Sequence, residues 1–149
     1  MHTYPSTAMK RYNHLLGEID SVYHEMSQKL GLSDSAMIIL YTICNSGDKC
    51  PLQDICRLSG ISKQTINSAI RKLEAENIVY LTPDGAKSKT VCLTDKGKEL
   101  AGRTALRILE AENAIFASWS KKDLEQYLAL TEKFLAQLRE KAQDIWQTP

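Results

Sequence analysis

The segment that most constrains the fold is residues 54–73, DICRLSGISKQTINSAIRKL, because two short helical patterns meet there at a glycine. Gly60 supplies the permissive backbone that a tight turn needs. Ser62 is placed to cap the second helix by accepting a hydrogen bond from a free backbone amide. The segment therefore predicts a helix-turn-helix.

The second of these helices has two chemically different faces. Its apolar residues recur at helical spacing and should pack inward; they are Ile66, Ala69, Ile70 and Leu73. The other face offers hydrogen-bond donors and positive charge, and the first carboxylate comes only at Glu74. A solvated surface helix is the alternative, but such helices usually mix Glu with Lys. The residues predicted to contact DNA from this helix are Ser62, Lys63, Gln64, Thr65, Asn67, Ser68 and Arg71.

A β-hairpin is predicted directly after this helix. Residues 78–82 and 90–93 are short apolar or β-branched runs, and the turn-rich residues 83–89 separate them. Lys87 and Lys89 lie near the predicted tip, where they are expected to contact a minor groove or a phosphate. A hairpin in this position is typical of the wing of a winged helix-turn-helix.

Residues 61–79 and 91–100 resemble the MarR family of bacterial transcription regulators. The second stretch, with its Leu-Thr-Asp-Lys-Gly core, is similar to the way this family passes from the wing into the next helix. The resemblance covers nearly the whole chain. It implies a mainly α fold with a small β-hairpin wing, in which the winged helix-turn-helix is flanked by long dimerisation helices.

The chain departs from the family pattern at two places. Many members carry Asp-x-Arg at the wing tip, and the matching positions here are Gly85 and Lys87. Lysine keeps the positive charge but lacks the planar fork of arginine, so weaker wing contacts are expected. Asn77 stands where the family often has Gly, and Asn tolerates the left-handed conformation that is expected there.

Long amphipathic helices are predicted on both sides of the winged segment. One runs from about Ala8 to Leu30, one begins at Thr94 and continues past Phe116, and another is capped by Ser120. Their apolar stripes exceed what a winged unit of roughly 60 residues can cover, which favours a homodimer over packing within one chain. Residues 1–32 and 95–149 are therefore predicted to form the dimerisation region, and residues 33–94 the DNA-binding region.

The resemblance also implies a cleft for an effector between the dimerisation helices and the winged unit. The aromatic and apolar residues Tyr12, Leu16 and Tyr41 are the candidates for lining it, with a small apolar or aromatic molecule as the effector. Ordinary packing of these side chains, and of Tyr41 above all, is the alternative.

The four cysteines lie at positions 44, 50, 56 and 92, which is not the spacing of common zinc sites, so no metal or other cofactor is expected. Burial is expected for Cys44, Cys56 and Cys92. Cys50 precedes Pro51 at a predicted helix start, where a thiolate would be favoured, so it is the candidate for a redox site. No run approaches the ~18 apolar residues of a membrane span, and a reducing cytoplasm is the expected compartment.

These patterns predict a sequence-specific transcription regulator, and the resemblance implies a ligand-responsive repressor that binds a palindromic DNA operator as a homodimer. The net charge of +1 requires that positive charge be concentrated on one face. Two alternatives remain: a winged-helix module that binds protein rather than DNA, and a regulator that senses oxidants through a thiol. An enzyme is not expected, because the sequence has no nucleophile elbow, phosphate-cradling glycine loop or dinucleotide fingerprint.

Overall fold

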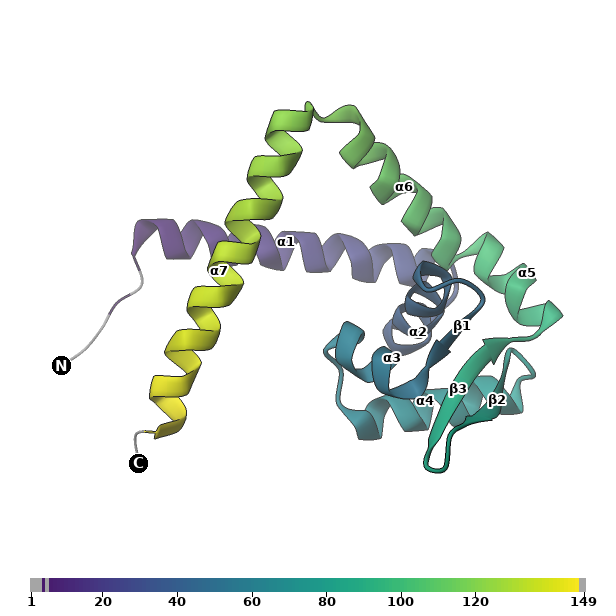
Figure 1. Ribbon diagram of the computed structural model, residues 1–149. Coiled ribbons are helices and arrows are strands. Elements are labelled where there is room, and N and C mark those ends of the chain that lie inside the picture. The colour runs from purple at the N-terminus through teal and green to yellow at the C-terminus, as the bar shows by residue number, and fades with distance from the viewer. Residues whose placement is uncertain (1–3, 5, 148–149) are drawn as a thin grey trace. The chain divides into compact units, whose positions relative to one another are not determined.

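The computed structural model describes residue 4 and residues 6–147. Its contacts divide the chain into two units, one that ends at Leu109 and one that begins at Glu110. Helices dominate both units, and the regular strands form one three-stranded antiparallel sheet (Figure 1). The predicted fold class, mainly α with a hairpin wing, is therefore confirmed.

The first unit, called here the winged unit, contains the helix-turn-helix, the wing and the helices next to them. The helix-turn-helix consists of α3 and α4, and the wing consists of β2 and β3, as predicted. Its elements are α1 (Thr7–Lys29), α2 (Asp34–Asn45), β1 (Lys49–Pro51), α3 (Leu52–Ser59), α4 (Lys63–Ala75), β2 (Val79–Asp84), β3 (Ser88–Leu93), α5 (Asp95–Arg103) and the beginning of α6 (Ala105–Ser118).

Local sequence signals set the ends of these helices. The hydroxyls of Ser33 and Ser62 accept hydrogen bonds from the amides of Ala36 and Thr65, at 3.1 and 3.3 Å, and so cap α2 and α4. Gly60 ends α3 with φ of 69°, a left-handed conformation that glycine adopts without steric cost. The predicted turn between α3 and α4 is confirmed.

The core of the winged unit lies between α2, the helix-turn-helix and the sheet. Its fully buried side chains come from every one of these elements, and they include Ile39, Leu40, Ile43, Ile55, Ile66, Val79 and Val91. Because α2 is apolar on nearly all sides, it occupies the centre, with α3 and α4 packed against it.

The sheet differs from the prediction in two respects. The hairpin strands extend further than expected, to Asp84 and from Ser88, so the tip is only three residues long. Residues 49–51 form a third strand, β1, which pairs with β3 so that Cys50 lies opposite Val91. Three residues are too few to show the alternating pattern that identifies a strand in a sequence.

The helix predicted to begin at Thr94 and continue past Phe116 is interrupted at Thr104. The buried Thr104 side chain donates a hydrogen bond to the carbonyl oxygen of Leu100, at 2.7 Å, and its backbone leaves the helical region with φ of −128°. A threonine hydroxyl bonded four residues back bends a helix. Two helices, α5 and α6, therefore replace the single predicted one.

A Schellman motif around Asn77 caps the C-terminal end of α4. Asn77 has φ of 61°, as predicted, and the amide of Ile78 donates to the carbonyl oxygen of Leu73 at 2.9 Å. Leu73 and Ile78 are both buried, which supplies the apolar contact that usually accompanies this motif. The chain thus passes directly from α4 into β2.

The same turn is joined to the start of α5, and the joined segment is called here the α4–α5 junction. The Thr94 hydroxyl lies 2.7 and 3.0 Å from the carbonyl oxygens of Asn77 and Ile78, and it accepts a hydrogen bond from the Gly97 amide at 2.9 Å. The Lys96 ammonium donates to the carbonyl oxygen of Glu76 at 3.0 Å. A β-carbon on Gly97 would lie 2.0 Å from the carbonyl oxygen of Ile78, so only glycine permits this approach.

The second unit contains the end of α6 and α7 (Lys121–Gln147). The rings of Phe116, Trp119 and Tyr127 pack edge to face at the corner between these helices, with centroids 5.3–6.2 Å apart. Ser120 caps α7 by accepting a hydrogen bond from the Asp123 amide, as predicted. None of the described residues of α7 is buried within the chain.

We expect Gly97→Ala to lower the free energy of unfolding by about 1–3 kcal/mol, because the new methyl group must displace the Ile78 backbone. Gly102→Ala is the matched control, since it also lies in α5 and a β-carbon there would meet open space. It should leave stability unchanged or slightly raised, because alanine favours a helix. Urea unfolding followed by circular dichroism measures both variants, and equal stability would contradict a tight junction.

Candidate nucleic-acid interface

The outward face of α4 is polar and accessible. Ile66, Ile70 and Leu73 are buried beneath it, which confirms the predicted inward face. Of the outward residues, Asn67 is half-buried, and the exposed ones are Ser62, Lys63, Gln64, Thr65, Ser68 and Arg71. Side chains that can donate hydrogen bonds therefore lie along one side of the helix.

Some of these polar groups are already engaged within the helix. The Ser62 hydroxyl donates to the Thr65 hydroxyl at 2.9 Å while it caps the helix, so these two side chains hold each other at the start of α4. Arg71 donates from Nε to the carbonyl oxygen of Asn67 at 3.4 Å. This contact lays the Arg71 stem along α4 and leaves the terminal guanidinium nitrogens for an outside acceptor.

One pocket of about 500 Å³ lies between α4 and the start of α2. Arg71 and Lys72 are its cationic residues, and Ser33 and Ser35 contribute from α2. The full lining is Ser33, Ser35, Gln64, Thr65, Ser68, Ala69, Arg71 and Lys72. Ser33, Ser35 and Lys72 have no local sequence pattern that connects them with this face, because only the packing of α2 against α4 brings them there.

A second pocket of about 410 Å³, called here the wing pocket, lies where α3, the start of α4 and the wing come together. It brings together the three predicted lysines, Lys63, Lys87 and Lys89, although they are up to 26 positions apart in the chain. The other lining residues are Leu52, Gln53, Cys56 and Ser88. Gln53 was not predicted as a DNA contact, since it belongs to α3 and not to α4 or the wing.

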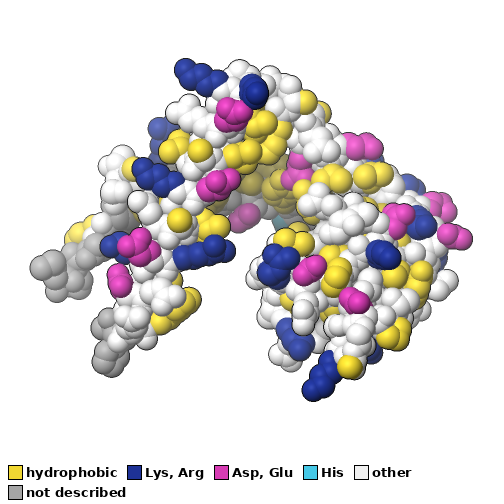
Figure 2. Space-filling model, in the orientation of Figure 1, with side chains coloured by type: hydrophobic (Ala, Val, Ile, Leu, Met, Phe, Trp, Pro, Cys, Tyr) yellow, Lys and Arg dark blue, Asp and Glu magenta, His cyan; other side chains and the backbone are white. Residues whose placement is uncertain are grey.

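The cations on this side of the winged unit take no part in the ion pairs of the described residues. Within residues 6–147, ion pairs engage other cations, such as Lys98 with Asp48 at 3.8 Å and Arg57 with Asp54 at 3.3 Å. No ion pair of the described part of the chain involves Lys63, Arg71, Lys87 or Lys89. Figure 2 shows Lys and Arg side chains along the lower edge of the winged unit. A polyanion would find positive charge and hydrogen-bond donors there.

The three candidate effector residues occupy different environments in the winged unit. Tyr41 on α2 packs, half-buried, against the core, whereas Tyr12 and Leu16 lie on α1. Met26 is the α1 residue that packs against the same core. At the ordinary rise of a helix, Leu16 and Tyr12 lie about 15 and 21 Å further along α1 from Met26. The effector site therefore stays a prediction.

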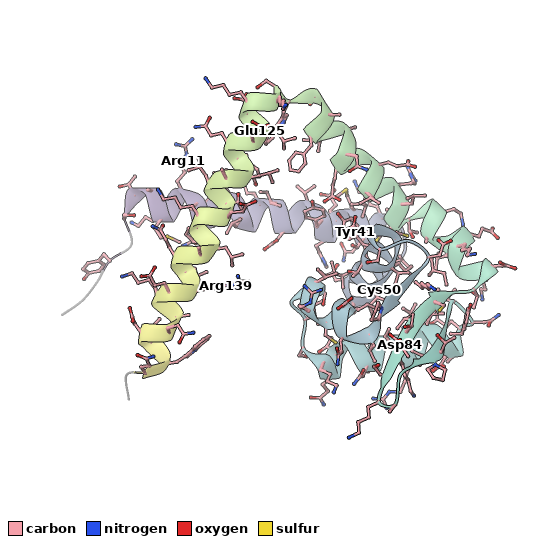
Figure 3. The ribbon with its side chains drawn as sticks, in the orientation of Figure 1. Arg11, Tyr41, Cys50, Asp84, Glu125 and Arg139 are labelled. Carbon is pink, nitrogen blue, oxygen red and sulfur yellow. The ribbon has the colours of Figure 1, made fainter. Side chains whose placement is uncertain are left out.

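The cysteines are exposed in a different order from the one expected. Cys50, the candidate redox site, is only 1% exposed, because it lies in β1 with its side chain in the core (Figure 3). Burial of this thiol gives no support to a redox role, which stays a prediction. Cys92 is buried as predicted, whereas Cys44 and Cys56 are half-buried. Burial, with a smaller contribution from the Asp48 carboxylate, raises the pKa of the Cys44 thiol and disfavours its thiolate.

Two features are absent from the described residues. Among them, no three His, Cys, Asp or Glu side chains come together as ligands for a metal ion. Within the same residues, none of the helices has the length and apolar character needed to cross a membrane.

We expect iodoacetamide to alkylate Cys44 and Cys56 in the native protein before Cys50 and Cys92, because the last two are covered by the sheet and the core. Because the pKa of the Cys44 thiol is raised, its alkylation should continue to accelerate as the pH rises above the ordinary pKa of a cysteine. Mass spectrometry of timed digests measures the order. Early alkylation of Cys50 would contradict the packing of β1.

Comparison with known proteins agrees with this geometry. Residues 30–88 match a model of the MarR family. No curated protein matches the chain.

The fold is shared with solved MarR-family regulators. A regulator from Neisseria meningitidis has a TM-score of 0.77 at 18% identity, over 95% of this chain and 100% of its own. One from Silicibacter pomeroyi has a TM-score of 0.67 at 22% identity, over 88% and 89%. BpsR of Bordetella bronchiseptica, whose DNA binding is regulated by 6-hydroxynicotinic acid, has a TM-score of 0.61 at 19% identity, over 83% and 98%.

Residues 30–88 therefore resemble the MarR family of transcription regulators, and the described chain has the fold of solved regulators of that family.

Proposed function

We propose that the chain is a sequence-specific DNA-binding regulator that reads a major groove with α4 and contacts the adjacent backbone with its wing. The observation that carries this proposal is the outward face of α4, where donors and cations are exposed and, among the described residues, form no ion pair with a carboxylate. Arg71 and Gln64 offer donors to base edges, and Lys63, Lys87 and Lys89 offer charge to phosphates.

A homodimer is part of the same proposal. Large apolar side chains lie exposed along α7 and α1 in a single chain, among them Leu128, Leu135 and Leu138 on α7 and Leu15 and Ile19 on α1. Figure 2 shows hydrophobic side chains at the surface near the corner between α6 and α7. A second copy that covers these faces would remove them from water and place two copies of α4 on the half-sites of a palindromic operator.

Repression and its release by a small apolar or aromatic effector complete the proposal. The regulation of BpsR by 6-hydroxynicotinic acid supports this class of effector. Residues 1–32 and 95–149 would form the dimerisation region and residues 33–94 the DNA-binding region, with Tyr12, Leu16 and Tyr41 as candidate effector contacts. A regulator of this kind acts in the cytoplasm and needs no catalytic residues.

Arg71→Ala and Lys63→Ala should each weaken binding to the operator by about 1–3 kcal/mol if the residue reads a base, because both side chains are exposed on the outward face. Fragments selected from the source genome supply the operator, and titration at fixed salt measures its affinity.

Arg103→Ala is the control for Arg71→Ala, since it removes the same charge from the exposed end of α5. It should bind the operator like the wild type. If Arg71→Ala and Lys63→Ala also bind it normally, α4 does not lie in the interface. Binding that is insensitive to salt would favour docking to protein instead, because phosphate contacts release counterions.

Leu138→Glu should convert the dimer to monomers, raising the dimer dissociation constant at least about tenfold, because an unpaired carboxylate is costly to bury in an apolar interface. Leu138 is 53% exposed in the single chain, so the monomer should still fold. Gln137→Glu adds the same charge at the neighbouring exposed position. Sedimentation equilibrium compares the two variants, and a stable Leu138→Glu dimer would exclude this face of α7.

A further inference from the structure

The wing pocket has features that contact with a DNA groove alone does not require. It is open to solvent and has a volume of about 410 Å³, within the range of pockets that hold small molecules. Three of its seven lining residues are lysines, and none of the seven is acidic. A cavity with this charge would attract a small anion as well as a strand of DNA.

Two helix starts add to the positive charge of the lysines. Leu52 and Gln53, the first residues of α3, line the pocket together with Lys63, the first residue of α4. Pro51, the residue before α3, makes no side-chain hydrogen bond to the first amides of that helix. Free amides and the aligned peptide dipoles both favour an anion at such a position.

The kind of cationic residue indicates which anion fits. Lysines are compact charges that approach from separate directions, whereas planar carboxylates are best matched by the fork of an arginine. Lys63 approaches from α4, and Lys87 and Lys89 approach from the wing. Three separate ammonium groups suit the oxygens of a tetrahedral phosphate group.

We propose that the wing pocket is a phosphate-binding site that a free phosphate-bearing small molecule occupies in competition with the DNA backbone. This inference rests on the proposed DNA-binding function, because the competing ligand is the phosphodiester of DNA. Occupancy by the free anion neutralises Lys63, Lys87 and Lys89 and so lowers the affinity for DNA. By linkage, bound DNA lowers the affinity for the anion to the same extent.

Inorganic pyrophosphate is the probe, added to the full chain without divalent cations and at constant ionic strength. Calorimetric titration should show saturable binding that Lys87→Ala/Lys89→Ala weakens at least about tenfold, since contacts between charged groups are lost. Lys121→Ala/Lys122→Ala is the control, because it removes the same charge from exposed positions at the start of α7. All four lysines are exposed, so both variants should fold.

Thiol alkylation locates the bound anion independently. Cys56 lines the wing pocket and Cys44 does not, and both are half-buried. Pyrophosphate should therefore slow alkylation of Cys56 and leave that of Cys44 unchanged. Equal effects on the two thiols would place the anion elsewhere and overturn the proposal.

Displacement of labelled DNA separates the two sources of phosphate. Pyrophosphate should displace DNA more strongly than sodium chloride at equal ionic strength. If the chain binds DNA but no pyrophosphate, or if the control variant loses pyrophosphate binding as much as Lys87→Ala/Lys89→Ala, the proposal fails while the DNA-binding function stands. If the chain binds pyrophosphate but no DNA of any sequence, the proposed function itself fails, and with it the competition.

Discussion

The arrangement of the winged unit depends on the α4–α5 junction, where a helix without a side chain at Gly97 meets the backbone of Ile78. The carbonyl oxygen of Ile78 accepts a hydrogen bond from the Thr94 amide at 3.1 Å. The same carbonyl group also packs against Gly97. Asn77 and Ile78 follow the last turn of α4, and Thr94 follows the last residue of β3. The junction therefore connects α4, both wing strands and α5. The contact at Gly97 is so close that it leaves no room for a methyl group.

The helix-turn-helix and wing bury their own apolar surface, whereas the long helices do not. Isoleucine, leucine and valine side chains from α2, α3, α4 and the sheet close a core within one chain. In α7, large side chains such as Phe134 and Leu135 remain 43–45% exposed, and no described residue of this helix is buried. A helix of this length keeps such a stripe only if something else covers it, which is the physical basis for proposing a second copy.

Charge placement matters more here than net charge. The chain is nearly neutral at +1, yet the ion pairs of the described residues do not involve the cations on the outward face of α4 or at the wing tip. The cations of α4 and the wing tip line two pockets: Lys63, Lys87 and Lys89 line one, and Arg71 and Lys72 line the other. Near-neutrality limits non-specific attraction at long range, so binding would depend on the local arrangement of these groups.

Signals within one or two turns of the chain were sufficient to predict the helix-turn-helix, the cap at Ser62 and the two faces of α4. Each of these depends on contacts between residues close in sequence, where spacing and backbone preference determine the outcome. Features that depend on contacts between distant residues were not predictable: β1 exists because β3 lies beside it, and Cys50 is buried for the same reason.

The candidate interface also has features that the local sequence predicts and features that depend on contacts between distant residues. Helical periodicity identified the outward residues of α4, because exposure of a polar face follows from burial of the opposite one. The turn-rich segment between two predicted strands identified the wing lysines. The two pockets exist only after α2, α3 and the wing have packed around α4. One pocket joins Lys63 with Lys87 and Lys89, and the other joins Arg71 with Ser33 and Ser35. The sequence by itself determined which side chains face outward, and the tertiary structure decided which of them meet, since meeting requires the whole core to form.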